Sequence, residues 1–472
     1  MRIVNSSVAP SPRSGTAYRD LSYWFDTLPE PARQRPGLDA DLEVDVAIVG
    51  AGYTGLWTAY YLAKMNPSIR VAVLERETAG FGASGRNGGW CSAMFATSSS
   101  KLIRIYGKAA EEALRKELEH TVDEVGAVTA AEGIDCDYRK GGTVMLARNA
   151  AQLHRAREEV DEARSLGVGE ADLRFLSGSE ARELVGATQI LGATYTPHCA
   201  SIHPARLVRG LAEVAERLGV RIFEGTAALE ISPGRVVTAR GTVRAEAVVR
   251  ATEGFSAQLA GAHREVIPFY SLMIATEPIG DDALGEIGLR NGETFNDLRH
   301  LVIYGQRTRD GRVAFGGRGA PYHFGSRIEP SFDRDQRMHS LIHETLVDLF
   351  PALAETRITH RWGGPLGIAR DWHPSVGFDR ATGIGWAGGY VGDGVAVTNL
   401  AGRTLAALVG GNENDCTRLC WVGHRSRRWE PEPLRWIGVN SALQLMGTAD
   451  RAEQRSGRPS RLAGAMGSLV GG

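Results

Sequence analysis

Residues 45–75 read DVAIVGAGYTGLWTAYYLAKMNPSIRVAVLE, and this stretch decides the fold. Residues 46–49 are an apolar run of strand length, residues 56–64 have helical character, and residues 69–74 are a second apolar run. Strand, glycine-rich turn, helix and strand within about 30 residues predict a βαβ unit. The chain is therefore expected to have an α/β fold built on a parallel sheet.

The glycines of the first turn predict a dinucleotide site of the Rossmann type. Gly50 permits a tight turn, Gly52 lets a pyrophosphate approach the backbone, and Gly55 lets the helix pack closely on the strand. The helix N-terminus offers N–H groups and positive partial charge to the phosphates. Glu75 ends the second strand, where a carboxylate accepts hydrogen bonds from a ribose diol. The expected contacts of this turn are Gly50, Gly52, Tyr53, Thr54 and Gly55.

A second glycine-rich loop follows directly, with residues 76–89 reading RETAGFGASGRNGG. Small residues with a hydroxyl and an amide among them can bring backbone N–H groups close to a large flat ligand. A nicotinamide dehydrogenase does not need a second glycine loop so soon. The expected cofactor contacts of this loop are Arg76, Gly82, Ser84, Arg86, Asn87, Gly88 and Gly89.

These two motifs resemble those of the FAD-dependent amine and amino-acid oxidoreductases of the D-amino-acid oxidase/glycine oxidase superfamily. Residues 84–89, SGRNGG, are most similar to the gamma-glutamylputrescine oxidoreductase-like branch. The resemblance implies FAD as the cofactor and a Rossmann-like FAD-binding domain interleaved with an antiparallel-sheet substrate domain of α+β type. It also implies that a residue near Ala228 contacts the adenine through backbone atoms.

A distant glycine turn supports the same resemblance. Residues 383–395 read GIGWAGGYVGDGV and precede an apolar helical stretch at residues 396–408. In the proteins that this chain resembles, such a turn places a helix N-terminus near the pyrimidine edge of the flavin, where positive charge stabilises the reduced ring. The expected contacts are Gly388, Gly389, Tyr390, Gly392, Gly394 and Val395.

The order of the apolar runs, read with the resemblance, predicts interleaved domains. The C-terminal tail is expected to pack on the body or on a second subunit rather than on a membrane, so a homo-oligomer remains open. The predicted division is an N-terminal arm at 1–43, the FAD-binding domain at 44–90, 200–260 and 361–410, the substrate domain at 91–199 and 261–360, and a helical tail at 411–472.

Composition excludes several function classes. A net charge of -1 provides no general field for nucleic acid or membranes. No apolar run is long enough for a transmembrane helix, and residues 1–20 contain no apolar signal core. The five cysteines form no CxxC pair, which favours free thiols in the cytoplasm and predicts no metal site.

The candidate substrate site is residues 361–374, RWGGPLGIARDWHP, which lie just ahead of the flavin turn. Trp362 is expected beside the flavin ring or in the core, at even odds. Arg361 could bind a substrate carboxylate bidentately, and His373 could hydrogen-bond the substrate, although a structural role is favoured for this histidine. Weaker candidates on the inferred substrate sheet are Tyr270, Tyr304 and His323.

The function implied by the resemblance is oxidation of a small-molecule amine or amino acid, with gamma-glutamylputrescine as one example. A hydride passes to flavin N5, the imine product hydrolyses, and the electrons go to oxygen or another acceptor. Monomeric sarcosine oxidases resemble this chain but activate oxygen with a substrate-domain lysine, and no lysine follows Lys140 here. The alternatives are a D-amino-acid or glycine-type dehydrogenase and a non-catalytic flavoprotein subunit.

Overall fold

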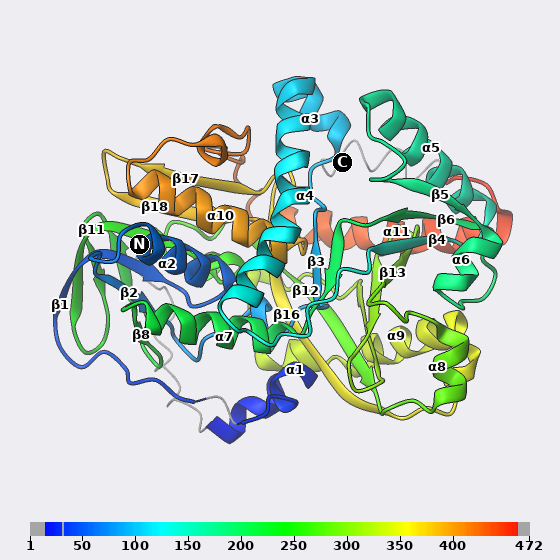
Figure 1. Cartoon of the computed structure of the whole chain (residues 1–472), viewed down its shortest axis with the longest axis horizontal. Helices are drawn as coiled ribbons and strands as arrows, with labels where there is room; N and C mark the ends of the chain where they lie inside the picture. The colour runs from blue at the N-terminus through cyan, green and yellow to red at the C-terminus, as the bar shows by residue number, and fades with distance from the viewer. Residues whose placement is uncertain (1–14, 31–32, 461–472) are drawn as a thin grey trace.

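The computed structural model describes residues 15–30 and 33–460 and contains two large mixed sheets that lie side by side (Figure 1). The first sheet is mainly parallel and the second mainly antiparallel. Segments from distant parts of the chain alternate between the two sheets. The predicted α/β fold with an α+β second part is confirmed.

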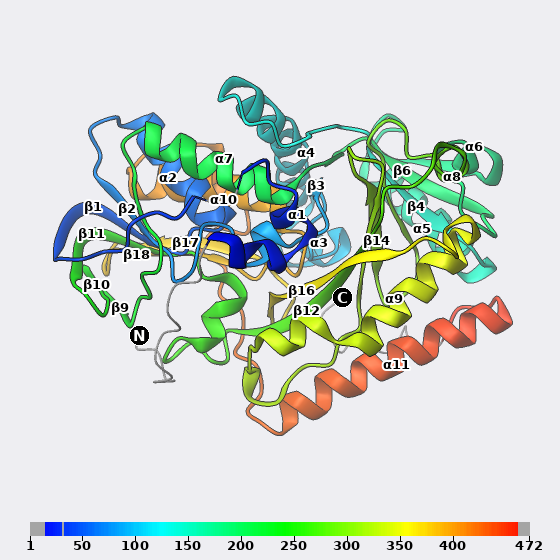
Figure 2. The same cartoon turned by 90° about the horizontal axis from the view of Figure 1, so that it is seen from below.

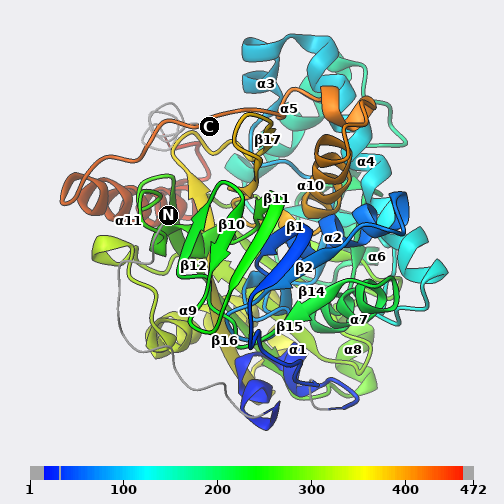
Figure 3. The same cartoon turned by 90° about the vertical axis from the view of Figure 1, so that its left-hand side faces the viewer.

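The first sheet has the strand order β17-β18-β11-β1-β2-β8. Strand β1 pairs in parallel with β2 on one side and with β11 on the other, as Figure 3 shows. This order places the start of the chain at the centre of the sheet and late segments at its edge. The strands are β1 (Leu42–Val49), β2 (Val71–Leu74), β8 (Arg221–Phe223), β11 (Thr242–Arg250), β17 (Ser375–Asp379) and β18 (Ile384–Gly388), with the hairpin β9 (Glu230–Ser232) and β10 (Arg235–Val237) beside β11.

Helices cover one face of the first sheet and enclose its main core. Helix α2 starts directly after the glycine turn and buries Leu56 and Trp57 completely. Helix α10 crosses it so closely that a Cβ on Gly402 would lie 2.5 Å from the Trp57 Cβ, so no larger residue fits at this crossing. The covering helices are α2 (Tyr53–Met65), α4 (Lys108–Ala131), α7 (Pro204–Arg217) and α10 (Gly394–Val409).

The second sheet has the order β16-β12-β15-β14-β13-β4-β6-β5. Alternate residues of β12 point to opposite faces, and Leu272 and Ile274 pack with Ile342 and Leu346 of α9. The strands are β4 (Thr143–Ala147), β5 (Arg174–Ser177), β6 (Gly192–Thr196), β12 (Val266–Thr276), β13 (Thr294–Asp297), β14 (Ile303–Arg307), β15 (Val313–Arg318) and β16 (Ile358–Ala369). The other elements of this half are α5 (Ala150–Leu166), α6 (Gly178–Leu184), α8 (Asp281–Ile287) and α9 (Gln336–Leu349), whereas α3 (Ser99–Tyr106) and the small sheet of β3 (Trp90–Ser92) and β7 (Cys199–Ser201) pack on the core of the first sheet.

The strand β16 corrects one predicted boundary. Residues 361–369 were expected in the FAD-binding part, but β16 pairs with β12 from Ile358 to Ala369 and belongs to the second sheet. The first sheet resumes only at Ser375, the start of β17. The segment GGPLGI contains two adjacent glycines and a proline, which suggest a turn, although the strand runs straight through them.

The two ends of the described chain pack on the body at different places. In the N-terminal arm, α1 (Tyr23–Asp26) buries both Tyr23 and Trp24, which anchor the arm to the body. The tail contains α11 (Leu434–Ser456), a long helix along one side of the second sheet (Figure 2). The parts of the arm and tail predicted at 1–14 and 461–472 lie outside the described residues. Within the described ranges, no helix combines the length and apolar character needed to cross a bilayer.

Candidate functional site

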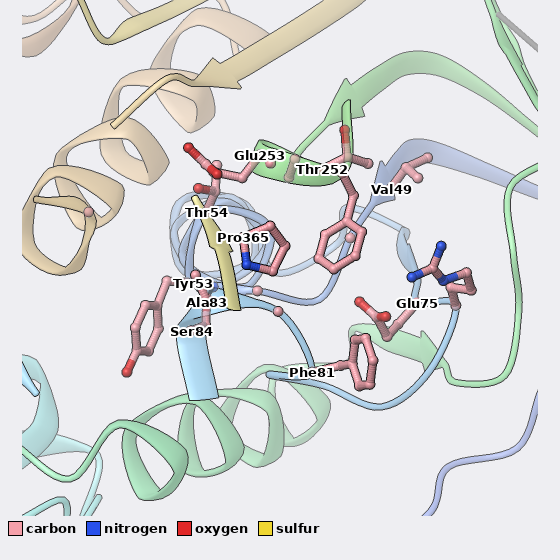
Figure 4. A pocket seen from close by; sticks show the side chains of 18 of the residues that line it. Val49, Tyr53, Thr54, Glu75, Phe81, Ala83, Ser84, Thr252, Glu253 and Pro365 are labelled. Carbon is pink, nitrogen blue, oxygen red and sulfur yellow. Dashed lines mark hydrogen bonds between the residues drawn. The ribbon is translucent and has the colours of Figure 1, made fainter. Parts of the chain in front are cut away.

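A cavity lies at the carboxyl edge of the first sheet, where β1, β2 and β11 end. Val49, Leu74 and Ala251, at these three strand ends, all line it (Figure 4). Strand order reverses at β1, because β2 lies on one side of it and β11 on the other. Such a switch point leaves a crevice between the two connections, which is where open α/β sheets bind ligands.

The glycine turn shapes the phosphate end of this cavity. Gly50 has φ +108, and a Cβ there would lie 2.4 Å from the Ala251 oxygen. Gly52 lines the cavity, whereas Gly55 lies behind it, where a Cβ would meet the Gly50 oxygen at 2.0 Å. The first turn of α2 opens onto the cavity at Tyr53 and Thr54. Backbone and a helix N-terminus, rather than side chains, therefore face the expected pyrophosphate.

Glu75 occupies the opposite end of the cavity. Its carboxylate accepts hydrogen bonds from the N–H groups of Ala51 (2.9 Å) and Glu77 (3.0 Å). Burial raises the pKa of Glu75 despite these two donors. A carboxylate that retains acceptor capacity inside a cavity suits a ribose diol. Arg76 lies next to it and donates to Gln258 (3.0 Å), and Ala228 lines the same end.

The second glycine loop is divided between the cavity and the second sheet. Gly82, Ser84 and Asn87 line the cavity, and Ser84 Oγ accepts from the Tyr53 N–H at 2.9 Å. Asn87 Oδ1 accepts from the Gly89 N–H (2.8 Å) and shapes the loop internally. The indole N–H of a tryptophan in α1 caps the loop from outside, since Trp24 Nε1 donates to the Asn87 oxygen at 2.8 Å.

The loop residues that do not line the cavity attach it to the second sheet. Arg86 is 3% exposed at its side chain and donates to Asp333 (2.9 Å) and to the Gly363 oxygen (3.1 Å). A Cβ on Gly88 would lie 2.6 Å from the Tyr304 ring, and one on Gly89 would overlap the Gln306 amide. Contacts with the second sheet therefore account for the residue types at Arg86, Gly88 and Gly89. We had expected these three residues to contact the cofactor directly.

The distant glycine turn closes the cavity from the other side. Tyr390, Gly392, Gly394 and Val395 line it, and α10 begins at Gly394. The Tyr390 hydroxyl and the Thr54 hydroxyl are 2.8 Å apart, which joins this turn to the first turn of α2. Gly388 and Gly389 stand just ahead of the turn and do not line the cavity.

Sequence reasoning missed several lining residues, among them the carboxylate of Glu253. Its carboxylate accepts from the N–H groups of Gly367 (2.6 Å) and Tyr390 (3.3 Å), and burial raises its pKa. Figure 4 shows it near Thr54 and away from Glu75. Pro365 and Leu366 of β16, which belong to the candidate segment at residues 361–374, line the cavity as well. The sequence signal that could have identified Glu253 is its position just after the apolar run at residues 245–251. If this run is a strand aligned with β1, Glu253 lies at the carboxyl edge of the sheet.

None of the three candidate catalytic residues lines the cavity: Trp362 lies in the core, His373 has the structural role that was favoured for it, and Arg361 is not placed to bind a substrate carboxylate. Trp362 is buried and donates from Nε1 to the Arg86 oxygen at 2.9 Å, so it supports the loop from behind. Arg361 is exposed on β16 and donates to the Ile358 oxygen. His373 is buried, stacks on His424 with ring centroids 3.9 Å apart, and has a pKa that burial lowers to about 4.

Two clusters of metal-ligand types occur away from this cavity, and ion pairs account for both. In the first, Glu119, Asp172 and His198 approach one another within 4.8 Å, and His198 Nε2 lies 3.0 Å from Asp172. In the second, His300 Nε2 lies 3.0 Å from Glu453. Charge pairing inside the protein is sufficient to hold these groups together.

The lining as a whole fits FAD. Glycines whose added Cβ atoms would collide with backbone, a helix N-terminus and an acceptor carboxylate match a ribose–pyrophosphate unit. The Pro365–Leu366 pair and the turn before α10 add an apolar wall and a positive helix end, which suit a flat ring that gains negative charge on reduction.

Comparison with known proteins supports this assignment. Residues 45–408 match the sequence profile of the family described as FAD dependent oxidoreductase (DAO). The chain is 31% identical over 410 residues to the probable oxidoreductase OrdL of Rhizobium meliloti (strain 1021), covering 83% of this chain and 89% of that protein. It is 30% identical over 393 residues to the gamma-glutamylputrescine oxidoreductase of Escherichia coli (strain K12), covering 82% and 86%.

A solved structure shows the same fold. The crystal structure of glycine oxidase from Geobacillus kaustophilus superposes with a TM-score of 0.65 at 24% identity, covering 81% of this chain and 99% of that chain. The profile match extends from the first glycine turn through α10, so it includes both turns that shape the cavity. The chain belongs to the FAD-dependent oxidoreductase family: it is an enzyme that acts on amines or amino acids, and FAD is its cofactor.

Proposed function

We propose that the enzyme oxidises a primary or secondary amine that carries no carboxylate next to the amine-bearing carbon. The observation that supports this choice is the state of the arginines around the cavity. A substrate carboxylate needs a guanidinium that is free to bind it. Arg86 is buried and already bound to Asp333 and Gly363, while Arg361 is exposed and does not line the cavity.

The remaining arginine of the cavity lining lies away from the end where a substrate carboxylate would have to be bound. Arg76 lies beside Glu75 and Gln258, where the adenosine part of FAD is expected. The flavin part is expected near Leu366 and Tyr390, at the other end of the cavity. A carboxylate clamp at the reacting end would therefore require one of the engaged arginines to leave its partners, which costs their charge-assisted hydrogen bonds.

The chemistry divides between cofactor and protein. Bound FAD accepts two electrons and a proton as a hydride from the carbon beside nitrogen, while that nitrogen loses a proton and a C=N bond forms. Water then adds to the released imine and yields a carbonyl compound and ammonia or a smaller amine. Dioxygen or a quinone-type carrier takes the electrons in a second half-reaction.

The protein residues position the parts of this reaction and keep water away. Pro365 and Leu366 form the apolar wall next to the turn before α10. Tyr304, whose hydroxyl lies 2.6 Å from the Ser271 hydroxyl, fixes the position of the Gly88 backbone against the second sheet. The N-terminus of α10 adds positive partial charge where negative charge develops.

The test is the visible spectrum of the purified protein under anaerobic conditions during addition of candidate substrates. The panel contains n-hexylamine, N-methylhexylamine, gamma-glutamylputrescine, sarcosine, glycine and D-alanine. We expect the purified protein to show flavin bands. Amines without an adjacent carboxylate should bleach these bands, whereas glycine and D-alanine should leave them unchanged. Bleaching by D-alanine or glycine alone would instead favour a D-amino-acid or glycine-type dehydrogenase.

Two further outcomes bear on the remaining alternatives. Flavin bands that no compound bleaches would favour a flavoprotein subunit that needs a partner, and protein without flavin bands would contradict the cofactor assignment. Admission of oxygen after bleaching identifies the acceptor class: rapid return of the bands indicates an oxidase, and slow return with rapid reoxidation by a quinone indicates a dehydrogenase.

A further inference from the structure

A second cavity, of about 590 Å³, lies between α11 and the second sheet. We call it the α11 chamber. Its volume is within the range of about 300–1,000 Å³ that small-molecule sites occupy. The side chains that form its floor and roof are largely apolar. The floor includes Ile267, Phe269 and Ile368 on β12 and β16, and the roof includes Val439, Ala442 and Met446 on α11.

The α11 chamber adjoins the flavin end of the FAD cavity. On β16, Leu366 lines the FAD cavity, and Ile368, two residues further on the same face of the strand, lines the chamber. On β12, Phe269 pairs with Leu366, and Ile267 pairs with Ile368. The two cavities therefore lie next to each other along these strands, and a ligand that reached from the flavin into the chamber would have to pass the side chains of Phe269 and Leu366.

The roof of the chamber is held in place by polar contacts outside the apolar part. Near its far end, Glu453 accepts from Arg155 (2.7 Å) and pairs with His300, and Asp450 accepts the N–H groups of His300 (2.7 Å) and Leu301 (2.9 Å). Ahead of α11, Trp429 Nε1 donates to the Ile368 oxygen at 2.8 Å. These contacts fix the position of α11 without filling the space between it and the sheet.

The charged side chains in the chamber lining are already paired. Arg370 donates from Nε to both oxygens of Glu430 (3.0 Å each) and lies over the Trp429 ring. Arg435 donates to Glu432 at 3.0 Å. The lining therefore offers a ligand no unpaired charge, whereas an apolar group gains from burial against the floor of the chamber.

We propose that the α11 chamber binds the apolar substituent of the amine substrate, so that the substrate is an alkyl- or arylalkylamine rather than a zwitterion. This inference rests on the proposed amine oxidation for its reactive end and adds the chemical class of the rest of the molecule. The family profile ends at residue 408, ahead of α11, so the roof of the chamber is a feature of this chain beyond the matched region.

The test uses the FAD-loaded protein and unbranched primary amines from ethylamine to octylamine. Each methylene that enters the chamber is expected to raise kcat/KM and to lower the calorimetric Kd by about 3- to 4-fold, until the chamber is full. Binding is measured separately from turnover, by anaerobic calorimetry on enzyme whose FAD has first been fully reduced, because reduced flavin cannot accept a hydride from the amine. The two readouts distinguish a failed binding site from a failed reaction.

The matched variants are Ala442→Trp, which fills the chamber from its roof, and Gln444→Trp, which places the same ring on the exposed side of α11. We expect Ala442→Trp to flatten the dependence of both kcat/KM and Kd on chain length. Gln444→Trp is expected to behave like the wild type. Wild-type FAD content and an unchanged urea unfolding midpoint in both variants would show that the fold is intact.

The outcomes separate the two proposals. Chain-length dependence of Kd that Ala442→Trp abolishes supports the chamber even if no amine bleaches the flavin, in which case the proposed function alone fails. Amine bleaching with a flat dependence on chain length, or with gamma-glutamylputrescine favoured over hexylamine, overturns the chamber inference and leaves amine oxidation in place. A steep dependence that Gln444→Trp also removes would place the apolar site elsewhere on the protein and overturn the inference.

Discussion

The FAD cavity and the α11 chamber lie next to each other along β16, and they are built in different ways. The FAD cavity is formed largely by backbone and small residues at the ends of β1, β2 and β11, within the segment that matches the family profile. The chamber is formed by large side chains from β12, β16 and α11. The comparison indicates that backbone geometry determines the shape of the cofactor site. The shape of the substrate site is determined by side chains, which can change as sequences diverge.

The largest expected effect comes from adding a methyl group at the glycine turn. Gly50→Ala forces a left-handed backbone on alanine, at about 1–3 kcal/mol, and brings its Cβ to 2.4 Å from the Ala251 oxygen. We expect near-complete loss of bound FAD, measured by the ratio of flavin to protein absorbance. The control is Gly219→Ala, which has a similar φ of +92 but no atom within 4 Å of the added methyl. Equal FAD loss in both variants would contradict the assignment of the turn to the cofactor.

The next effect concerns the carboxylate at the adenosine end. Glu75→Gln replaces a charged acceptor by a neutral one, and we expect FAD affinity to fall by a factor on the order of 10 to 100, or about 1.5–3 kcal/mol. Reconstitution of apoprotein with FAD measures this affinity. Glu77→Gln, two residues further on and outside the cavity lining, should leave it unchanged. An unchanged affinity in Glu75→Gln would show that the ribose lies elsewhere.

On the chamber side, Glu453→Gln tests how firmly α11 is attached. Burial by itself raises the pKa of Glu453, but hydrogen bonds from Arg155 and His300 outweigh it and hold the pKa at about 2. Since this is below the ordinary value of 4.5, the stabilisation is fully present above pH 4.5 and is lost as the pH falls toward 2. We expect the variant to lose about 1–2 kcal/mol at pH 7, because Arg155 is 25% exposed.

Urea unfolding of wild type and Glu453→Gln across pH 7 to 3 measures this stabilisation, with hydrogen exchange in α11 as the local readout. The difference in unfolding free energy between the two proteins should narrow below pH 4.5. A difference that stays constant down to pH 3 would show that another group, and not the ionised Glu453 carboxylate, attaches the helix.

The smallest expected effect lies at the N-terminal arm. Trp24→Phe removes the hydrogen bond from Nε1 to the Asn87 oxygen, worth about 1 kcal/mol, and should speed FAD dissociation several-fold. Trp57→Phe is the comparison, because its buried Nε1 has no hydrogen-bond partner among the described residues. Equal FAD dissociation rates in both variants would indicate that ring volume, not the hydrogen bond, holds the loop.

The same contrast explains what the sequence predicts and what it does not. The turn at Gly50 and Gly52 and the acid at Glu75 follow from local patterns of strand, glycine and helix, and the structure gathers them around one cavity. Glu253 is missed because its position depends on the parallel pairing of β11 with β1, a contact between segments about 200 residues apart.

Along β16, the register against β12 decides which residues reach the cofactor cavity, and this register is not readable from the sequence. Trp362 faces the interior and supports Arg86 from behind, Arg361 faces solvent, and Pro365 and Leu366 reach the cavity. All four belong to one recognisable motif, but its register against β12 is set by the whole sheet. The chamber is harder still to predict, because it exists only once α11 has docked.

The most direct test of the account is a crystal structure of the FAD-loaded protein with n-hexylamine bound under anaerobic conditions. We predict FAD extended from Glu75 to the turn before α10, the amine-bearing carbon against the flavin ring near Leu366, and the alkyl chain beneath Ala442. An alkyl chain that points to solvent, with the space beneath α11 filled only by water, would contradict the account of the substrate end. FAD bound away from the glycine turn would contradict the proposed positions of both the cofactor and the substrate.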